Sequence, residues 1–377
     1  MTRRERLQAT FRGLAVDRPA VCFNEINGLD ENPHDDSPFN IFQDPSWRPL
    51  IELAREKTDR IVLRGVAYKE FIPDPVEPFA TIQSVHQNES LFTTKIISVA
   101  GKNLTSRTRR DADINTVWTL EHFVKSVQDV ELILQLPMES LQGVLNPDPI
   151  LSAEQALGDT GVVMVDTPDP ICLAAGLCSM EVFTVIALTE PLLFHSLLEK
   201  VANFIYPITR ETARLLPGRP WRIYGPEYAS PPFLPPRLFR DYVLRYDQPM
   251  VEVIHRSNGF VRWHSHGRLK EILDDIVASG CDGLDPIEPP PQGDMKLQQV
   301  RERYGKQLVL FGNLEISDIE NMPGEKFRDK IHRALSEGTA GEGRGFVLMP
   351  SACPIGRKLK PLTLANYELM VEMVESI

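Results

Sequence analysis

The chain has 377 residues, with 41 Lys and Arg against 52 Asp and Glu, so its formal net charge is −11 at pH 7. This length allows a large buried core, and an acidic chain without a Lys/Arg block excludes nucleic acids and anionic membranes as expected partners. Five scattered cysteines and a polar N-terminus exclude a disulfide framework and a signal peptide, and they indicate a reducing cytoplasm.

Short apolar runs alternate with longer amphipathic segments along most of the chain, a pattern typical of βα units and a parallel sheet. The predicted strands are Ala20–Asn24, Arg60–Leu63, Gly161–Val165, Trp221–Tyr224, Phe260–His264, Gly283–Asp285, Leu308–Phe311 and Phe346–Met349. The predicted helices are Pro191–Leu215, Pro236–Arg256, Leu269–Ala278, Lys296–Arg303, Lys326–Glu337 and Leu364–Glu375. Eight such strands predict an α/β fold, a (β/α)8 TIM barrel with an N-terminal extension, forming a single domain over residues 1–377.

Two stretches depart from this pattern. Between residues 66 and 120, apolar runs flank Gly101 without helical periodicity, which predicts a β-hairpin insertion. The most apolar stretch, Ile171–Leu188, contains Gly176 and Glu181, so we expect a buried helix there rather than a membrane span.

The apolar run of the predicted fifth strand ends in two histidines two apart, His264 and His266, followed by Gly267. Residues two apart in a strand point to the same face, and barrel active sites lie at the C-terminal strand ends. Two converging imidazoles supply two of the three protein ligands that a catalytic zinc site usually has. The alternative is an ordinary polar pair at a strand end.

The third zinc ligand predicted from the sequence is Cys353, which follows the last strand. Glu227 follows the predicted strand Trp221–Tyr224, which precedes the histidine strand in the chain. It is a candidate fourth ligand or a hydrogen-bond acceptor for an imidazole N–H. Cys353 has the alternative of a small buried residue, and Glu227 that of an ion pair with Arg222 or Arg237.

Three further strand-end residues are candidates for substrate binding: Asp166, Asp285 and Asn313. Asp285 opens a proline-rich loop that could equally brace the barrel rim, and Asn313 could instead cap the next helix. The chain has no Walker loop, G-x-G-x-x-G or G-x-S-x-G motif, which excludes the common nucleotide-binding and serine-hydrolase sites.

The chain resembles the uroporphyrinogen decarboxylase superfamily, and in particular its cobalamin-linked methyltransferase branch. The segments that carry the resemblance are Arg3–Gly13, Asp17–Val21, Phe239–Val243, Trp263–Gly267, Gly280–Pro289, Leu310–Leu314, Gly345–Ile355 and Asn366–Val371. The resemblance implies a (β/α)8 barrel and, in the methyltransferase branch, a zinc held by a His-X-Cys pair and a second Cys after the last strand. Here these positions read His264, His266 and Cys353.

The resemblance also discriminates between branches. The decarboxylase branch carries a Gly-His-Gly loop after the last strand and an N-terminal Arg-Gln-Ala-Gly-Arg motif. This chain has Ser351-Ala-Cys-Pro and Asn24-Glu-Ile-Asn instead, which disfavours tetrapyrrole decarboxylation. Imidazole in place of one thiolate makes a zinc ion more Lewis-acidic and a bound thiolate less nucleophilic, so a methyl ether is as coherent a substrate as a thiol.

The leading hypothesis is a zinc-dependent methyltransferase that moves a methyl group between a small thiol or methyl ether and a corrinoid on a partner protein. Glu227 and His264 are its predicted catalytic residues, and a homodimer is left open. The first alternative is a metal-free decarboxylase or lyase with these two residues as acid–base groups. The last is a non-catalytic binding protein.

Overall fold

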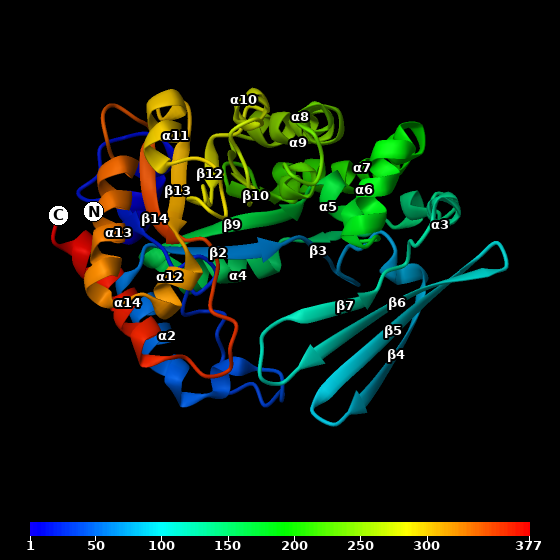
Figure 1. The fold of residues 1–377 in the computed structure, drawn as a ribbon, viewed down its shortest axis with the longest axis horizontal. Coiled ribbons are helices and arrows are strands. Elements are labelled where there is room, and N and C mark those ends of the chain that lie inside the picture. The colour runs from blue at the N-terminus through cyan, green and yellow to red at the C-terminus, as the bar shows by residue number, and fades with distance from the viewer.

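Eight parallel strands form one curled sheet in the computed structural model, which describes all 377 residues (Figure 1). They are β1 (Ala20–Val21), β2 (Arg60–Gly65), β9 (Gly161–Pro168), β10 (Pro220–Tyr224), β11 (Phe260–His264), β12 (Gly283–Asp285), β13 (Val309–Leu314) and β14 (Gly345–Pro350). Their spatial order is β1-β14-β13-β12-β11-β10-β9-β2, so chain order runs around the sheet. The Asp59 N–H donates to the Val21 carbonyl at 2.7 Å, which joins the two edges of the sheet. The predicted α/β fold with a barrel-like parallel sheet is confirmed.

Helices lie around the outside of this sheet (Figure 1). Their bounds are α1 (Arg3–Phe11), α2 (Arg48–Lys57), α3 (Val127–Ile133), α4 (Asp148–Leu157), α5 (Pro170–Ala175), α6 (Met180–Thr189), α7 (Pro191–Leu215), α8 (Pro236–Phe239), α9 (Arg245–Arg256), α10 (Leu273–Ala278), α11 (Leu297–Tyr304), α12 (Ile316–Asn321), α13 (Gly324–Gly338) and α14 (Pro361–Glu375). The main core is one cluster of 84 buried residues that spans Val21 to Val374. No single helix is long and apolar enough to cross a membrane; α6 and α7 pass that test only together, with a 116° bend between them.

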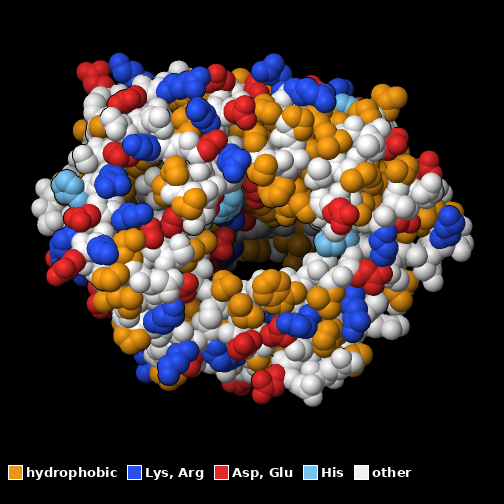
Figure 2. Space-filling view, viewed as in Figure 1, with side chains coloured by type: hydrophobic (Ala, Val, Ile, Leu, Met, Phe, Trp, Pro, Cys, Tyr) orange, Lys and Arg blue, Asp and Glu red, His pale blue; other side chains and the backbone are white.

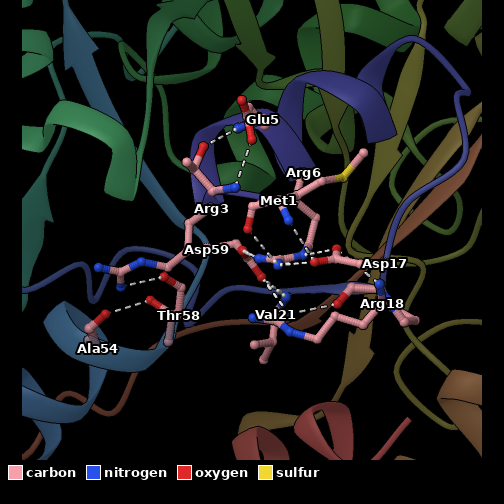
Figure 3. A network of polar contacts seen from close by, with 12 residues as sticks. Met1, Arg3, Glu5, Arg6, Asp17, Arg18, Val21, Ala54, Thr58 and Asp59 are labelled. Carbon is pink, nitrogen blue, oxygen red and sulfur yellow. Dashed lines mark hydrogen bonds and ion pairs between the residues drawn. The ribbon is translucent and has the colours of Figure 1, made fainter.

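The N-terminal helix α1 closes the end of the sheet that is opposite the strand C-termini. Its Phe11 ring stacks on Phe260 of β11 with centroids 4.6 Å apart. Arg6 of the same helix forms ion pairs with Asp17 and with the fully buried Asp59, which also pairs with Arg18 (Figure 3). Because Asp59 comes directly before β2, this network ties the first helix to the sheet edge.

The insertion is larger than the predicted hairpin. It is a four-stranded antiparallel sheet that projects below the barrel in Figure 1, made of β4 (Ala80–Gln87), β5 (Ser90–Val99), β6 (Lys102–Asp111) and β7 (Val117–Glu121). The predicted hairpin corresponds to its two central strands, β5 and β6. Short strands β3 (Ala67–Tyr68) and β8 (Leu145–Asn146) pair with each other between this sheet and the barrel.

Several predicted bounds differ from those of the structure: the helix predicted at Leu269–Ala278 begins at Leu273, and the apolar stretch Ile171–Leu188 forms two short helices, α5 and α6. The first strand ends at Val21 rather than at Asn24, whose φ of 54° is incompatible with an extended strand. The predicted helix Pro236–Arg256 is interrupted by a π-helical turn at Arg240–Leu244. The early end of β1 matters for the site, because Glu25 and the residues after it then lie outside the sheet and line the barrel mouth.

Candidate active site

The histidine pair is held by two carboxylates from the neighbouring strand end. His264 is the last residue of β11, and its Nδ1 lies 2.7 Å from the Asp285 Oδ2 of β12. The His266 Nδ1 lies 2.9 Å from the Glu288 Oε1. The two rings are 4.7 Å apart and nearly perpendicular, at 88°. Both carboxylates contact Nδ1, so each ring keeps its Nε2 for another partner. Metal-binding histidines are commonly fixed in this way.

Asp285 was predicted to bind substrate, and that role stays a prediction. Its side chain is fully buried and accepts two hydrogen bonds from Arg262, at 2.5 and 2.7 Å. Burial alone would raise the pKa of Asp285, but the charges of Arg262 and His264 hold it below the usual range. Asp285 is therefore a buried, ionised carboxylate that orients the His264 ring.

Glu288 has the same role for His266 and for the turn that follows. Its Oε2 accepts from the Gly267 N–H at 2.7 Å. Burial lowers the pKa of His266, but the hydrogen bond to Glu288 and nearby carboxylates outweigh it and raise that pKa. One of those carboxylates is Glu227. Its Oε2 is buried without a partner, and it pairs with neither Arg222 nor Arg237.

Cys353 lies on another part of the mouth. Its Sγ contacts the Phe23 carbonyl at 3.8 Å, and β14 is separated from β11 by two strands. Burial, together with the Glu25 charge, raises the pKa of the Cys353 thiol. No group of three His, Cys, Asp or Glu side chains is arranged to hold a metal ion. The two imidazoles are placed as in a zinc site, but no third His, Cys, Asp or Glu side chain is in position to complete it. Zinc binding therefore stays a prediction.

A cavity of about 360 Å³ occupies the half of the mouth that contains Cys353. Four carboxylates and one arginine contribute to its lining: Glu25, Asp30, Glu31, Asp166 and Arg222. Arg222 donates to both oxygens of Asp166, at 2.7 and 2.9 Å, and to Glu25 at 3.2 Å. Asn115, from the loop between β6 and β7, also borders this cavity. Figure 2 shows the molecule hollowed near its centre, with hydrophobic and charged side chains around the opening.

Asn313 lies elsewhere. It lines a second cavity, of about 440 Å³, between the barrel rim and α13, together with Glu315 and Arg333. The three predicted substrate residues thus have three different surroundings: Asp166 faces the first cavity, Asn313 the second, and Asp285 is buried.

Sequence reasoning missed the two arginines that organise the mouth, Arg222 and Arg262. The sequence signal that could have found them is the same for both: each arginine lies at the centre of a short apolar strand. In the structure the two are register partners. A charged residue at such a position needs a buried carboxylate partner. That requirement could have assigned Asp166 and Asp285 to ion pairs.

The sequence model of the uroporphyrinogen decarboxylase family matches residues 118–377, more than half of the chain. The chain belongs to this family. A structure described as a methyltransferase from Methanosarcina mazei shares the fold with a TM-score of 0.62 and 16% identity, covering 100% of this chain and 99% of that one. A D-psicose 3-epimerase from Clostridium cellulolyticum H10 aligns at a TM-score of only 0.37 and 9% identity, over 61% and 86% of the two chains, and supports no argument. No curated protein sequence matches the chain significantly.

Proposed function

We propose that the protein is a methyltransferase that moves a methyl group between a small thiol or methyl ether and a corrinoid carried by a partner protein. Membership of the uroporphyrinogen decarboxylase family and the shared fold with a Methanosarcina mazei methyltransferase support an enzyme of this kind. The observation that carries the proposal is the histidine pair, because each Nδ1 is fixed by a carboxylate and each Nε2 is free of protein partners.

In this proposal His264 and His266 would hold a zinc ion and Glu227, whose charge acts on His266, would complete the site, whereas Cys353, the predicted third ligand, lies on the other half of the mouth. Zinc would favour the thiolate form of a bound thiol, or polarise the oxygen of a methyl ether. Asp285 and Glu288 keep the two rings in one tautomer and one orientation. The unpartnered Glu227 Oε2 is available to take a proton from a thiol or to give one to an ether oxygen.

Metal analysis of protein purified without added metal tests the proposal. We expect about one zinc per chain in the wild type, and loss of most of it in His266→Ala. His332→Ala, on α13 and outside the mouth, is the matched control and should keep the zinc. Demethylation of methylcobalamin by a thiol, followed by its absorbance, reports the reaction itself. Wild-type protein with neither zinc nor methyl transfer would contradict the proposal.

A metal-free decarboxylase or lyase is the second candidate. The separation of Cys353 from the two histidines favours it, since His264 and Glu227 then serve as an acid–base pair without a third ligand. Activity that survives exhaustive chelation and the Cys353→Ser substitution would select this candidate over the first.

A further inference from the structure

The projecting antiparallel sheet has one edge that nothing in the molecule covers. Its strand β4 pairs with β5 on one side only, over eight residues from Ala80 to Gln87. From Thr81 to Gln87, no backbone group forms a hydrogen bond outside that ladder. Figure 1 shows β4 at the lower edge of the sheet, away from the barrel. Alternate residues of β4 therefore direct their N–H and C=O groups to solvent.

The sequence of β4 has none of the features that usually protect a strand edge. Natural edge strands are blocked by charged side chains, by proline, by a bulge or by a covering loop. Ala80–Gln87 contains no Lys, Arg, Asp, Glu, proline or glycine, and its ladder with β5 has no register shift. Every side chain from Thr81 to Gln87 is exposed, including Ile82 and Val85. A regular, exposed edge of this length is a template for a further strand.

The opposite edge of the same sheet, β7, is protected. This strand has only five residues, and its pairing with β6 is interrupted by a bulge. It ends in Glu121, which pairs with Lys125 at 2.9 Å. Just before β7, the Asn115 N–H donates to the Ile355 carbonyl at 2.7 Å, so the chain after the last barrel strand lies against this end. The unprotected edge is thus a property of β4 and not of the sheet as a whole.

The charge distribution of the chain indicates a second copy as the occupant of this edge. Residues 80–121, which form the sheet, contain five Lys or Arg and four Asp or Glu. The sheet therefore carries a formal charge of +1, whereas the rest of the chain carries −12 of the total of −11. Two copies of this acidic chain repel each other least where their sheets meet.

The side chains of β4 are also complementary to themselves. An antiparallel pair related by a two-fold axis places each β4 residue opposite a residue of the same strand in the other copy. The hydroxyl and amide side chains of β4 each carry a donor and an acceptor, so any of them can bond to its own kind. These residues are Thr81, Gln83, Ser84 and Gln87. Ile82 and Val85 add apolar contacts, one on each face of the sheet.

We propose that β4 pairs antiparallel with β4 of a second copy of this chain, which joins two four-stranded sheets into one sheet of eight strands. The contact is small, because a single strand from each copy makes it, so the dimer forms in a concentration-dependent equilibrium. No residue of β4 lines the cavity of the barrel mouth, and the inference is independent of the proposed methyl transfer.

Sedimentation equilibrium at several protein concentrations tests the proposal with a matched pair of variants. Val85→Lys places a charge on β4 and Val117→Lys places one on β7, and the two valines are 56% and 55% exposed. We expect Val85→Lys to weaken the wild-type dimer about tenfold, because the two-fold axis applies the substitution twice. Val117→Lys should dimerise as the wild type does.

Two results of this measurement overturn the proposal. One is a wild-type chain that stays monomeric at every concentration, which would leave the β4 edge unused or to a strand of another protein. The other is a dimer that the two variants affect equally, since the contact would then not depend on β4.

Hydrogen exchange locates the contact in the wild-type protein without any substitution. Raising the protein concentration should slow amide exchange in the segment that contains β4 and leave β7 unchanged, because pairing protects the free N–H groups of the β4 edge. In Val85→Lys, exchange of the same segment should respond to concentration much less. Concentration-dependent protection confined to another part of the chain would contradict the assignment to β4.

Discussion

The two halves of the barrel mouth use the same residue pair in opposite ways. Arg222 of β10 and Arg262 of β11 are register partners in adjacent strands. Arg222 reaches back to Asp166 of β9, while Arg262 reaches forward to Asp285 of β12. The Asp285 side chain is fully buried, whereas that of Asp166 is 18% exposed.

This difference divides the mouth into an orienting half and a binding half. Around β11 and β12, Asp285 and Glu288 fix the two imidazoles, so the groups that would act on a substrate are preorganised. Around β9, β10 and the chain after β1, the carboxylates face an open cavity. Substitutions in the two halves should therefore fail differently, and each of the following predictions tests this contrast.

The largest effect is expected for Asp285→Asn. Arg262 is 1% exposed, and loss of its carboxylate would leave a buried charge unpaired, so the free energy of unfolding should fall by about 3–5 kcal/mol. Asp166→Asn is the matched variant, and the partial exposure of that pair should limit its cost to about 1–2 kcal/mol. Urea unfolding measures both. Equal losses would show that the two halves are not different in this respect.

A smaller effect is expected for Glu288→Gln. It should lower zinc affinity or methyl transfer by about 10–100-fold, since His266 loses the partner that fixes its ring. Asp282→Asn provides the control, because the His255–Asp282 pair has a similar 2.8 Å contact but lies outside the mouth. Activity per folded protein should be unchanged in the control. Full activity in Glu288→Gln would show that Glu288 is not needed to orient His266.

Glu315 predicts a pH effect at the rim between β13 and α12. Burial, helped by the Glu288 charge, raises the pKa of Glu315 from 4.5 to about 7. Between these values the folded protein holds a proton that the unfolded chain releases, so stability falls as pH rises from about 4.5 to about 7. With solvent screening the change is on the order of 1–2 kcal/mol. Thermal unfolding at several pH values should show this decrease, and Glu315→Gln should abolish it while Glu325→Gln keeps it.

The orienting half was easier to predict from the sequence than the binding half. His264 and His266 stand out because they lie two residues apart at the end of an apolar run, although β11 itself stops at His264, and the eight buried runs define the sheet. The register of His264 with Asp285 was not visible, because a three-residue strand that is buried throughout has no alternation to read.

The binding half depends on contacts that no local pattern encodes. Glu25 and Asp30 come from an irregular segment that begins where Asn24 adopts a φ of 54°. Cys353 was expected near the histidines, but the strand order places β14 between β1 and β13. The outer strands β4 and β7 of the insertion escaped prediction because their side chains are mostly exposed and lack periodic burial.

The smallest effect on stability is expected for Glu25→Gln. The Glu25 side chain is 57% exposed and makes one contact of 3.2 Å with an arginine that Asp166 already neutralises, so the free energy of unfolding should change by less than about 0.5 kcal/mol. Thermal unfolding measures this change. A loss comparable to that of Asp285→Asn would mean that Glu25 is a structural partner of Arg222, and the binding half would then be as fully committed to its ion pairs as the orienting half. A neutral result leaves the Glu25 carboxylate free for a ligand, because a charge at a cavity wall that contributes little to folding is available for binding.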